Sequence, residues 1–342
     1  MSEIKVNNIQ SLSGTNGPEI SGTVEMNSTG AMSLPRGDTA YRGGRGRGLL
    51  SGGFAGPSTR FNAIEYVTIS TTGSVFDFGD LTEEVARGGC CASSVRGLFQ
   101  GGVKSPGNAT NTMSYVTISS TGNAFDFGDI SNVGNRFGST SCSNNIRGLY
   151  GGGYNPVLQT QIDLTTISSL GNSSSFGNLS VARRNVSSLA SPTRGVFSGG
   201  YNKSATDKRT IDYVTISTIG DALDFGDLTE ARHICISVSS STRGVTAGGY
   251  TTGFVNTIDY ITIASLGDAI NFGDLSGVRG EMGGCSNSIR GIFAGGYNPS
   301  EVSTVEFVTI ASLGNASNFG NLSAVKRRLL NGQCSDSHGG IG

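Results

Sequence analysis

The chain has 342 residues, 54 of them glycine, and a formal net charge of −1 without a long basic or acidic run. This balance argues against nucleic-acid binding by bulk electrostatics. No apolar run approaches the roughly 20 residues that span a bilayer, and the N-terminus lacks the basic and apolar segments of a secretory signal. Glycine at about twice its usual share marks turns, and short alternating runs of Val, Ile, Thr, Tyr and Phe predict an all-β fold.

Residues 1–40 form a polar N-terminal segment that we expect to remain outside the folded core. Only Ile4, Val6 and Ile9 suggest a short strand, so the segment orders against something else or stays mobile. The sequence of this segment, from KVNNIQ through NGPEISG to residues 30–36 at its end, resembles the N-termini of bacteriophage tail and fibre proteins, notably those of marine cyanobacterial phages. The resemblance implies a virion-attachment segment whose partners are other virion proteins.

The remainder of the chain repeats one pattern with a period of 47 to 51 residues. Each copy begins with an Arg-Gly pair and reaches a Gly-Gly doublet a few residues later. The six copies, called repeats one to six below, begin at Arg47, Arg96, Arg147, Arg194, Arg243 and Arg290. A fixed period of this length predicts a repeat architecture.

Each repeat contains four strand-like pieces. In the first repeat these are residues 47–53, 64–70, 76–81 and 88–95, with a polar loop after Gly-Gly and a Thr-Gly turn between the middle pieces. The second piece alternates apolar and polar residues, which is typical of a strand with one buried face. The last piece consists of small residues and leads into the next Arg-Gly.

This order resembles the kelch repeat, in which a Gly-Gly doublet, a Tyr and a second aromatic residue precede the next blade. The Tyr position holds Tyr66, Tyr115, Tyr213 and Tyr260, while Leu164 and Phe307 depart from the pattern. A Phe at each repeat stands where kelch repeats usually carry Trp: Phe78, Phe127, Phe176, Phe225, Phe272 and Phe319. The resemblance implies blades of four antiparallel strands, and hence a six-bladed kelch-like β-propeller over residues 41–342.

The two ends of the repeated region have complementary defects. Residues 37–46, which precede Arg47, do not have the sequence of a small-residue strand. Residues 329–336 do have the sequence of such a strand, but no Gly-Gly strand follows them. We therefore expect the C-terminal strand to complete the first blade and remove an open sheet edge.

Length changes between repeats fall in two places, the loop after Gly-Gly and the connector at 130–141. Strand parity sends both to the same end of the fold, which is typical of a binding face in repeat proteins. The loops carry aromatic and amide side chains of the kind that contact sugars. We therefore predict a ligand-binding set of Tyr154, Asn155, Tyr201, Asn202, Tyr250, Tyr297 and Asn298.

Other constellations have simpler interpretations. The six repeated arginines suggest either an anion site or, preferably, a structural role, in which Asp77, Asp126 and Asp224 pair with them or with backbone amides. Paired acids such as Asp77 and Asp80 suggest calcium or, preferably, turn hydrogen bonds. Cys91, Cys142 and Cys285 share one repeat position and read as small buried side chains. With His233 and His338 as the only histidines, we predict no metal site, cofactor or catalytic residue, and no enzyme.

The function that the resemblance implies is that of a phage virion structural protein of the tail-fibre or receptor-binding type. The N-terminal segment would anchor it in the virion, in several copies, while one propeller face contacts a host surface polysaccharide or protein. Two alternatives stay open, a capsid or tail decoration protein with a structural role and an intracellular kelch-type adaptor. We expect the protein to be made in the host cytoplasm, to be located on the virion exterior, and to bind no nucleic acid and insert into no membrane.

Overall fold

The computed structural model describes residues 46–130, 135–202 and 208–341. The chain divides into two units, residues 1–36 and 37–342, and all of the described residues belong to the second. The strand and the attachment role predicted for the N-terminal segment lie outside the described residues.

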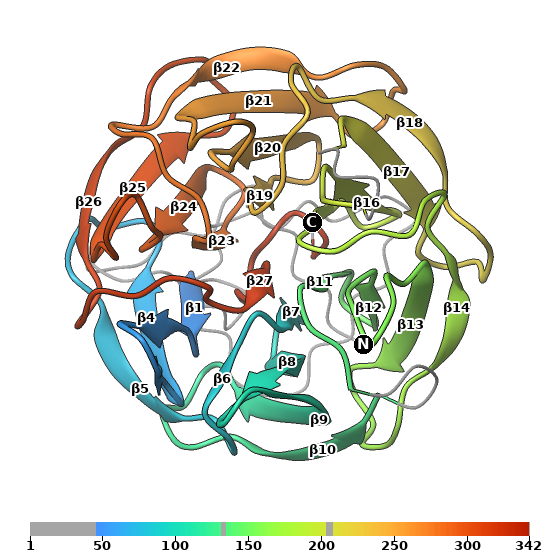
Figure 1. Cartoon of the computed structure of the whole chain (residues 1–342), viewed down its shortest axis with the longest axis vertical. Helices are drawn as coiled ribbons and strands as arrows, with labels where there is room; N and C mark the ends of the chain where they lie inside the picture. Colours follow the sequence, from blue (N-terminus) through green and yellow to red (C-terminus); the bar gives the residue numbers. More distant parts are fainter. Residues whose placement is uncertain (1–45, 131–134, 203–207, 342) are drawn as a thin grey trace, which may run out of the picture. The chain divides into compact units, whose positions relative to one another are not determined.

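The described part of the chain is all-β and forms no helix, as the sequence predicts (Figure 1). Its strands group by repeat, and from here on each small-residue strand is counted with the Arg-Gly strand that follows it, because the two pair in one sheet, as β7 does with β8. Repeat one contains β1 (Arg47–Ser51), β4 (Ala63–Thr68) and β5 (Phe76–Asp80); repeat two contains β7 (Gly89–Ala92), β8 (Arg96–Lys104), β9 (Asn108–Thr117) and β10 (Phe125–Asp129); repeat three contains β11 (Thr140–Ser143), β12 (Arg147–Gly151), β13 (Gln161–Thr166) and β14 (Ser174–Asn178). Repeat four contains β15 (Ser187–Ala190), β16 (Arg194–Ser198), β17 (Thr210–Thr215) and β18 (Leu223–Asp227); repeat five contains β19 (Ile236–Ser239), β20 (Arg243–Ala247), β21 (Thr257–Thr262) and β22 (Ile270–Asp274); repeat six contains β23 (Gly283–Ser286), β24 (Arg290–Ala294), β25 (Thr304–Thr309) and β26 (Ser317–Asn321). The short strands are β2 (Phe54–Ala55), β3 (Thr59–Arg60), β6 (Val85–Ala86) and β27 (Asn331–Gly332).

Within a repeat the strands pair antiparallel in chain order, as in β15-β16-β17-β18. The predicted pieces and the observed strands agree to within a few residues. A register shift just before the Phe-Gly of each fourth strand, for example between Ile211 and Asp212 opposite β18, turns that Phe inward. Phe225 and its counterparts are almost fully buried and form the core with the apolar residues of the inner strands.

The sheets follow one another around a common centre, with the small-residue strands innermost (Figure 1). β27 pairs in parallel with β7 on one side and β11 on the other, so the sheets of repeats two and three become one ten-stranded sheet. The chain then continues along the central space, where Gln333 accepts hydrogen bonds from Ser239 N (3.2 Å) and Ser286 Oγ (2.8 Å).

The same C-terminal segment also lies beside β1. Leu49 N donates to Cys334 O (2.7 Å), and Asp336 N donates to Arg47 O (3.3 Å). His338 is buried farther along, between Ala92 O (2.8 Å) and Ser143 Oγ (3.3 Å). Residues 332–340 are buried, so this segment fills the space that the innermost strands leave.

The repeated arginines bind each sheet to the next one. Arg47 donates to Ile118 O of repeat two (2.9 Å), and the same contact recurs around the fold until Arg290 donates to Ser70 O of repeat one (2.8 Å). Arg47 also stacks 4.6 Å above the centre of the Tyr66 ring. The arginines are therefore structural, as the sequence analysis preferred. Their partners are backbone carbonyls and aromatic rings, so the predicted pairing with Asp77 and its counterparts is wrong.

The glycine of each Arg-Gly pair permits this close contact between sheets. A Cβ atom at Gly48 would lie 2.2 Å from Cys285 Sγ, and one at Gly148 would lie 2.9 Å from Cys91 Sγ. All six cysteines are buried and free, so the sequence interpretation of them as small packing residues is confirmed. Burial raises the pKa of the Cys91 thiol to about 12, which keeps the thiol protonated at neutral pH.

A second contact joins the outer edges of neighbouring sheets. The turn between the third and fourth strands contains a glycine, and its N–H donates to the carbonyl of the fourth-strand Phe of the preceding repeat. Gly122 N donates to Phe78 O (2.7 Å), and Gly73 N donates to Phe319 O of the last repeat (2.8 Å). Both series of bonds therefore return from repeat six to repeat one.

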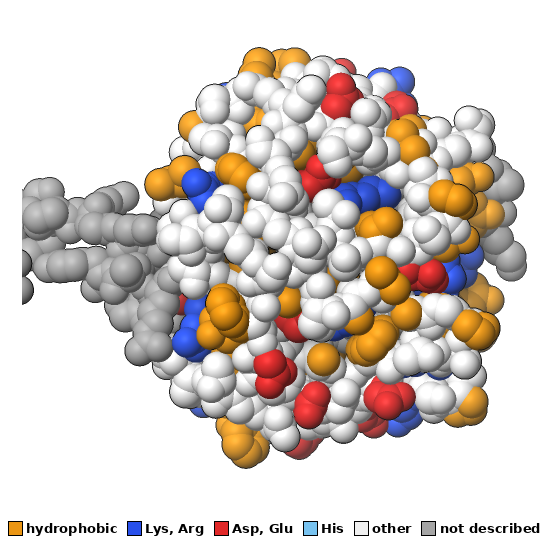
Figure 2. All heavy atoms as spheres, turned by 90° about the vertical axis from the view of Figure 1, so that its left-hand side faces the viewer, with side chains coloured by type: hydrophobic (Ala, Val, Ile, Leu, Met, Phe, Trp, Pro, Cys, Tyr) orange, Lys and Arg blue, Asp and Glu red, His pale blue; other side chains and the backbone are white. Residues whose placement is uncertain are grey.

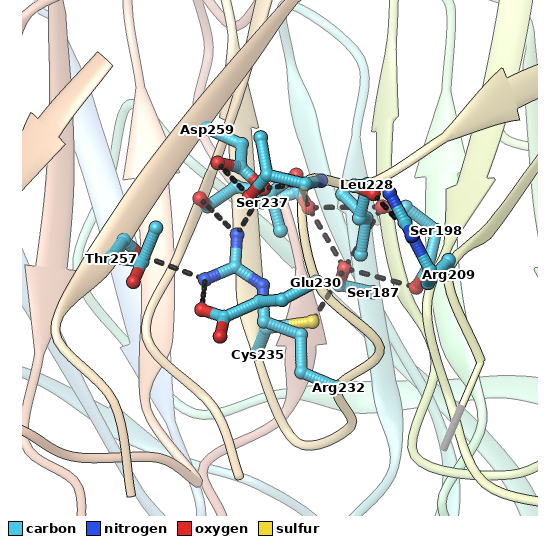
Figure 3. A network of polar contacts seen from close by, with 12 residues as sticks. Ser187, Ser198, Arg209, Leu228, Glu230, Arg232, Cys235, Ser237, Thr257 and Asp259 are labelled. Carbon is cyan, nitrogen blue, oxygen red and sulfur yellow. Dashed lines mark hydrogen bonds and ion pairs between the residues drawn. The ribbon is translucent and has the colours of Figure 1, made fainter. Parts of the chain in front are cut away.

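Buried ion pairs anchor the connectors between sheets. They join Arg136 to Asp163 (2.6 Å), Arg183 to Asp212 (3.0 Å), Arg232 to Asp259 (2.8 Å), Arg279 to Glu306, and Lys326 to Glu65 (2.8 Å). The surroundings of one pair appear in Figure 3, where Arg232 also donates to Thr257 O (2.8 Å) and lies 3.7 Å from Glu230. The equivalent positions in repeat two are Val85 and Ser114. The sheet of repeat two therefore has no ion pair at this place.

Replacing Arg183 by Val should lower the free energy of unfolding by about 3 kcal/mol or more, because Asp212 would stay buried without its cation. The double replacement Arg183→Val with Asp212→Ser reproduces the Val85 and Ser114 combination of repeat two at the same sequence separation of 29 residues. We expect it to recover more than half of the loss in a chemical denaturation experiment. A double variant no more stable than the single one would contradict this account.

Deleting residues 329–342 should cause aggregation or a large fall in melting temperature. Leu329 and Leu330 are buried, and losing their burial alone costs about 3–6 kcal/mol. The bonds to β1 and to the centre would be lost as well. Gln333→Ala, which removes only the contacts to Ser239 and Ser286, serves as the milder comparison in the same thermal melt. A truncated protein that melts like the full chain would show that the segment is dispensable.

Acid should destabilise the fold through His338. Burial lowers the pKa of this imidazole from 6.5 to about 4, against the opposing hydrogen bond to Ala92 O. Between these values the unfolded chain binds a proton that the folded protein does not, so stability is complete above about pH 6.5 and falls by about 3 kcal/mol as the pH approaches 4. Urea denaturation across this range should show a flatter pH dependence in His338→Asn; equal slopes for the two proteins would exclude the effect.

Candidate functional site

The sheets present two different ends to solvent. We call the end with the loops after Gly-Gly and the connectors between sheets the loop face, and the end with the Arg-Gly turns and the turns before the fourth strands the turn face. Single antiparallel bridges pair connector residues with residues that follow Gly-Gly, as in Phe137 with Tyr154 and Gly280 with Tyr297. The prediction that loops and connectors share one end is therefore confirmed.

Three consecutive connector residues build the loop face in each repeat. Except at Val85, the first is the buried cation of an ion pair, such as Arg183. The second, Arg184 in the same connector, bridges to the loop residue Tyr201. The third, Asn185, has a positive φ of 56° and lies near the centre. The buried pair between Arg183 and Asp212 fixes the position of the other two residues.

The third residues of all the connectors form a closed ring of backbone hydrogen bonds around the centre, which we call the axial ring. In order, Gly138 N donates to Arg87 O (2.8 Å), Asn185 N to Gly138 O (2.6 Å), Ile234 N to Asn185 O (3.1 Å), Glu281 N to Ile234 O (2.9 Å), Arg328 N to Glu281 O (2.7 Å) and Arg87 N to Arg328 O (3.0 Å). Since each ring residue uses both its N–H and its C=O in this way, only side chains are left to contact a ligand.

The axial ring is conformationally strained. Arg87, Asn185, Ile234, Glu281 and Arg328 have φ values between 51° and 61°. This left-handed region costs a residue with a side chain about 1 kcal/mol or more, and is least suited to a β-branched one such as Ile234. Such strain persists only where the surroundings impose it, which the ion pairs and the ring bonds do here.

The second connector residues and the loop aromatics form a nearly continuous belt around the axial ring, called the aromatic belt below. Neighbouring ring centres or guanidinium carbons along it lie between 4.2 and 5.9 Å apart. In order the belt runs through Arg87, Phe137, Tyr154, Arg184, Tyr201, His233, Tyr250, Phe254, Tyr297, Arg327 and Phe54. It is interrupted at repeat two, where Ala86 pairs with Val103.

The predicted ligand-binding residues that belong to this belt are Tyr154, Tyr201, Tyr250 and Tyr297, and all of them are half-buried. Each ring packs against its neighbours, so it is only partly accessible to a ligand and is not the freely exposed platform that the sequence suggested. Asn298 donates to Val278 O (2.9 Å), which places part of its amide in structural use. Asn155 lines an open polar groove together with Asn108, Asn111 and Lys104, and Asn202 lies half-buried at the same face.

Sequence reasoning missed the connector residues of the site, Phe137, Arg184, His233, Arg327 and the axial ring. A signal was present, because a basic residue recurs at 136, 183, 232, 279 and 326 with an acid 27 or 29 residues after each of the first four. The two residues that follow each of these cations have no shared identity, and their common role is visible only in space.

The turn face differs in chemistry. It carries exposed aliphatic side chains at equivalent places of several repeats, including Ile146, Ile219, Leu266, Ile289 and Leu313, each more than half exposed. Figure 2, which views the side of the protein that contains β5 and β26, shows hydrophobic side chains in separate small groups among charged ones. The two ends therefore differ in that the turn face adds exposed aliphatic side chains to arginines stacked on rings such as Tyr66, whereas the loop face carries aromatic and cationic side chains beside polar loops.

The described residues contain neither a cluster that could hold a metal ion nor a helix that could span a membrane. No group of three or more His, Cys, Asp or Glu side chains there could hold a metal ion, and no helix there is long and apolar enough to cross a membrane.

No protein-family model matches the chain, and no curated protein is significantly similar to it.

Proposed function

We propose that residues 41–342 form a six-bladed, kelch-like β-propeller in which the C-terminal segment completes the first blade. Three series of bonds support this arrangement, the arginine contacts, the outer turn contacts and the axial ring, because each runs through the repeats in order and returns from the sixth to the first. The bonds between Leu49 and Cys334 and between Asp336 and Arg47 place a fourth backbone segment at the open side of β1.

We further propose that the protein is a phage virion component of the tail-fibre or receptor-binding type, whose loop face contacts a host surface glycan. The observation that carries this proposal is the aromatic belt. Aromatic rings and guanidinium groups present flat apolar surfaces with polar edges, which suit sugar rings and their hydroxyl groups. Lys104, Asn108 and Asn155 add polar groups in the adjacent groove. The N-terminal segment, residues 1–40, would anchor the protein to other virion proteins.

Weak individual contacts fit this role. A shallow contact to a sugar is usually weak alone, and several copies on one particle raise the overall affinity through effective concentration. The near neutrality of the whole chain means that attraction to the host depends on the local chemistry of the loop face and not on net charge.

A structural role as a tail or capsid decoration protein is the second candidate, and the turn face favours it. Ile146, Ile219, Leu266 and Leu313 are between 56 and 62 % exposed. Aliphatic groups repeated over one end of a protein suit packing against another protein. In this case the loop face would have no part in adsorption.

Replacing Tyr154, Tyr201 and Tyr297 by Ala should weaken binding to host cells. Each ring contact is on the order of 1 kcal/mol, so the triple variant should lose about two orders of magnitude in single-site affinity. The measurement is adsorption of purified protein, and of particles that carry it, to a panel of candidate host cells. Because the rings are half-buried, a thermal melt must confirm folding, and Tyr201→Leu provides a variant that keeps the bulk of the side chain.

The matched control replaces Ile146, Ile219 and Leu266 of the turn face by Ser. Normal adsorption of this control, with loss in the tyrosine variant, supports the loop face. Loss in the control alone would place the contact at the turn face, and unchanged adsorption in both would favour the decoration role over receptor binding.

A further inference from the structure

The axial ring surrounds a small blind cavity at the centre of the loop face. Its wall consists of the ring residues, Arg87, Gly138, Asn185, Ile234, Glu281 and Arg328. Leu329, Asn331, Cys235 and Met282 also line it, and the C-terminal segment that continues from Asn331 fills the space beyond. The cavity volume of about 40 Å³ is enough for a few small atoms but not for a sugar ring.

The charges around this cavity are unbalanced. Glu281 is approached by Arg328 Nε (2.8 Å), by Arg87 (3.5 Å) and by Arg327 (3.6 Å). Arg327 also contacts Glu301 (3.1 Å), and Arg184 is close enough to repel Arg87. Of the residues that line the cavity, Arg87 and Arg328 are cationic and Glu281 is anionic, so the lining carries an excess of one positive charge.

The cations here are partly desolvated and crowd one another. Burial, followed by repulsion from Arg328, lowers the pKa of Arg87 to about 10, while Glu281 acts in the opposite direction. The side chains of Arg87 and Arg328 are still 30 and 24 % exposed, whereas that of Glu281 is only 9 % exposed. The acid is therefore buried among the arginines, and the solvent-facing charge of the cavity is positive.

We propose that this cavity binds a single anionic group, a carboxylate, sulfate or phosphate ester, carried by an acidic polysaccharide. The inference rests on the proposed glycan-binding function and specifies its ligand class. Guanidinium groups bind such oxyanions through paired charge-assisted hydrogen bonds. The cavity admits only the charged substituent, so the attached sugar ring must lie outside it, where the aromatic belt surrounds the opening.

The choice of a glycan over an acidic peptide follows from the surroundings of the cavity. Each belt residue in a connector is the chain neighbour of an axial-ring residue, as Phe137 is of Gly138 and Arg184 of Asn185. A sugar unit whose acidic group occupies the cavity therefore lies within reach of aromatic edges on several sides. The described edges at this opening are single bridges, apart from the two-residue strand β6, so they offer no extended ladder for pairing with a peptide.

The test measures direct binding of oligogalacturonate, neutral oligogalactose and sodium sulfate to the purified full chain by calorimetry at low salt. We expect oligogalacturonate to bind, sulfate to compete with it, and the neutral oligomer to bind more weakly. Arg328→Gln should reduce affinity for oligogalacturonate by about tenfold, the value of one charge-assisted hydrogen bond. Glu281→Gln should have the opposite effect and tighten binding, since it removes the competing carboxylate.

Arg209→Gln is the matched control, because Arg209 is an exposed arginine whose Nε bonds to Leu228 O and which does not line the cavity. Equal binding of acidic and neutral oligomers, or equal effects of Arg328→Gln and Arg209→Gln, would overturn the proposal. Tighter binding of polyglutamate than of oligogalacturonate would also overturn it in favour of a peptide ligand. If the tyrosine variants lose cell adsorption while Arg328→Gln does not, the receptor-binding function stands and the anion site does not.

Discussion

Backbone carbonyls of one sheet receive hydrogen bonds from the neighbouring repeat at three distances from the centre, and the rest of the structure depends on these contacts. At the outer edge Gly73 N reaches Phe319 O, at the turn face Arg290 reaches Ser70 O, and at the centre Arg87 N reaches Arg328 O. A single repeat of this kind cannot bury its apolar faces alone and depends on packing against its neighbours. Each series of contacts returns from repeat six to repeat one, so every sheet is stabilised by both of its neighbours as well as by its own core. A defect in one connector therefore affects two sheets.

The buried cations connect this framework to the surface chemistry. Isolated charges in the interior would be very costly, but each cation is paired with a carboxylate, and Arg136, Arg183 and Arg232 also donate to the backbone, the last to Thr246 O (3.2 Å). The connector is thereby fixed at the residue that precedes the aromatic belt and the axial ring. Strain at Ile234 and Glu281 is tolerated for this reason. The absence of the pair at Val85 and Ser114 coincides with the interruption of the belt at Ala86, which is consistent with the same dependence.

Much of the fold could be predicted because its repeats are regular in sequence. The Arg-Gly and Phe-Gly spacings locate the strands, and strand parity assigns the loops to one end. The contacts between sheets could not be predicted, since spacing reports register within a sheet but not what faces it. The arginines bind carbonyl groups of the next sheet, a partner that their spacing does not reveal, and not an acidic residue such as Asp77. The connector residues Phe137, Arg184 and His233 differ in type, so only their position relative to the buried cation relates them.

The path of the C-terminal segment links the proposed ligand site to the closure of the fold. Arg328 belongs to the connector that joins repeat six to repeat one, and Arg87 to the connector that joins repeat one to repeat two. An anion held between them would link the two connectors on either side of repeat one, beside the C-terminal segment. A ligand that binds only the folded state stabilises it in proportion to its concentration over its dissociation constant. Occupation of the axial cavity by an acidic sugar would thus strengthen the contact that closes the series of sheets, and it would do so while the belt residues engage the remainder of the glycan.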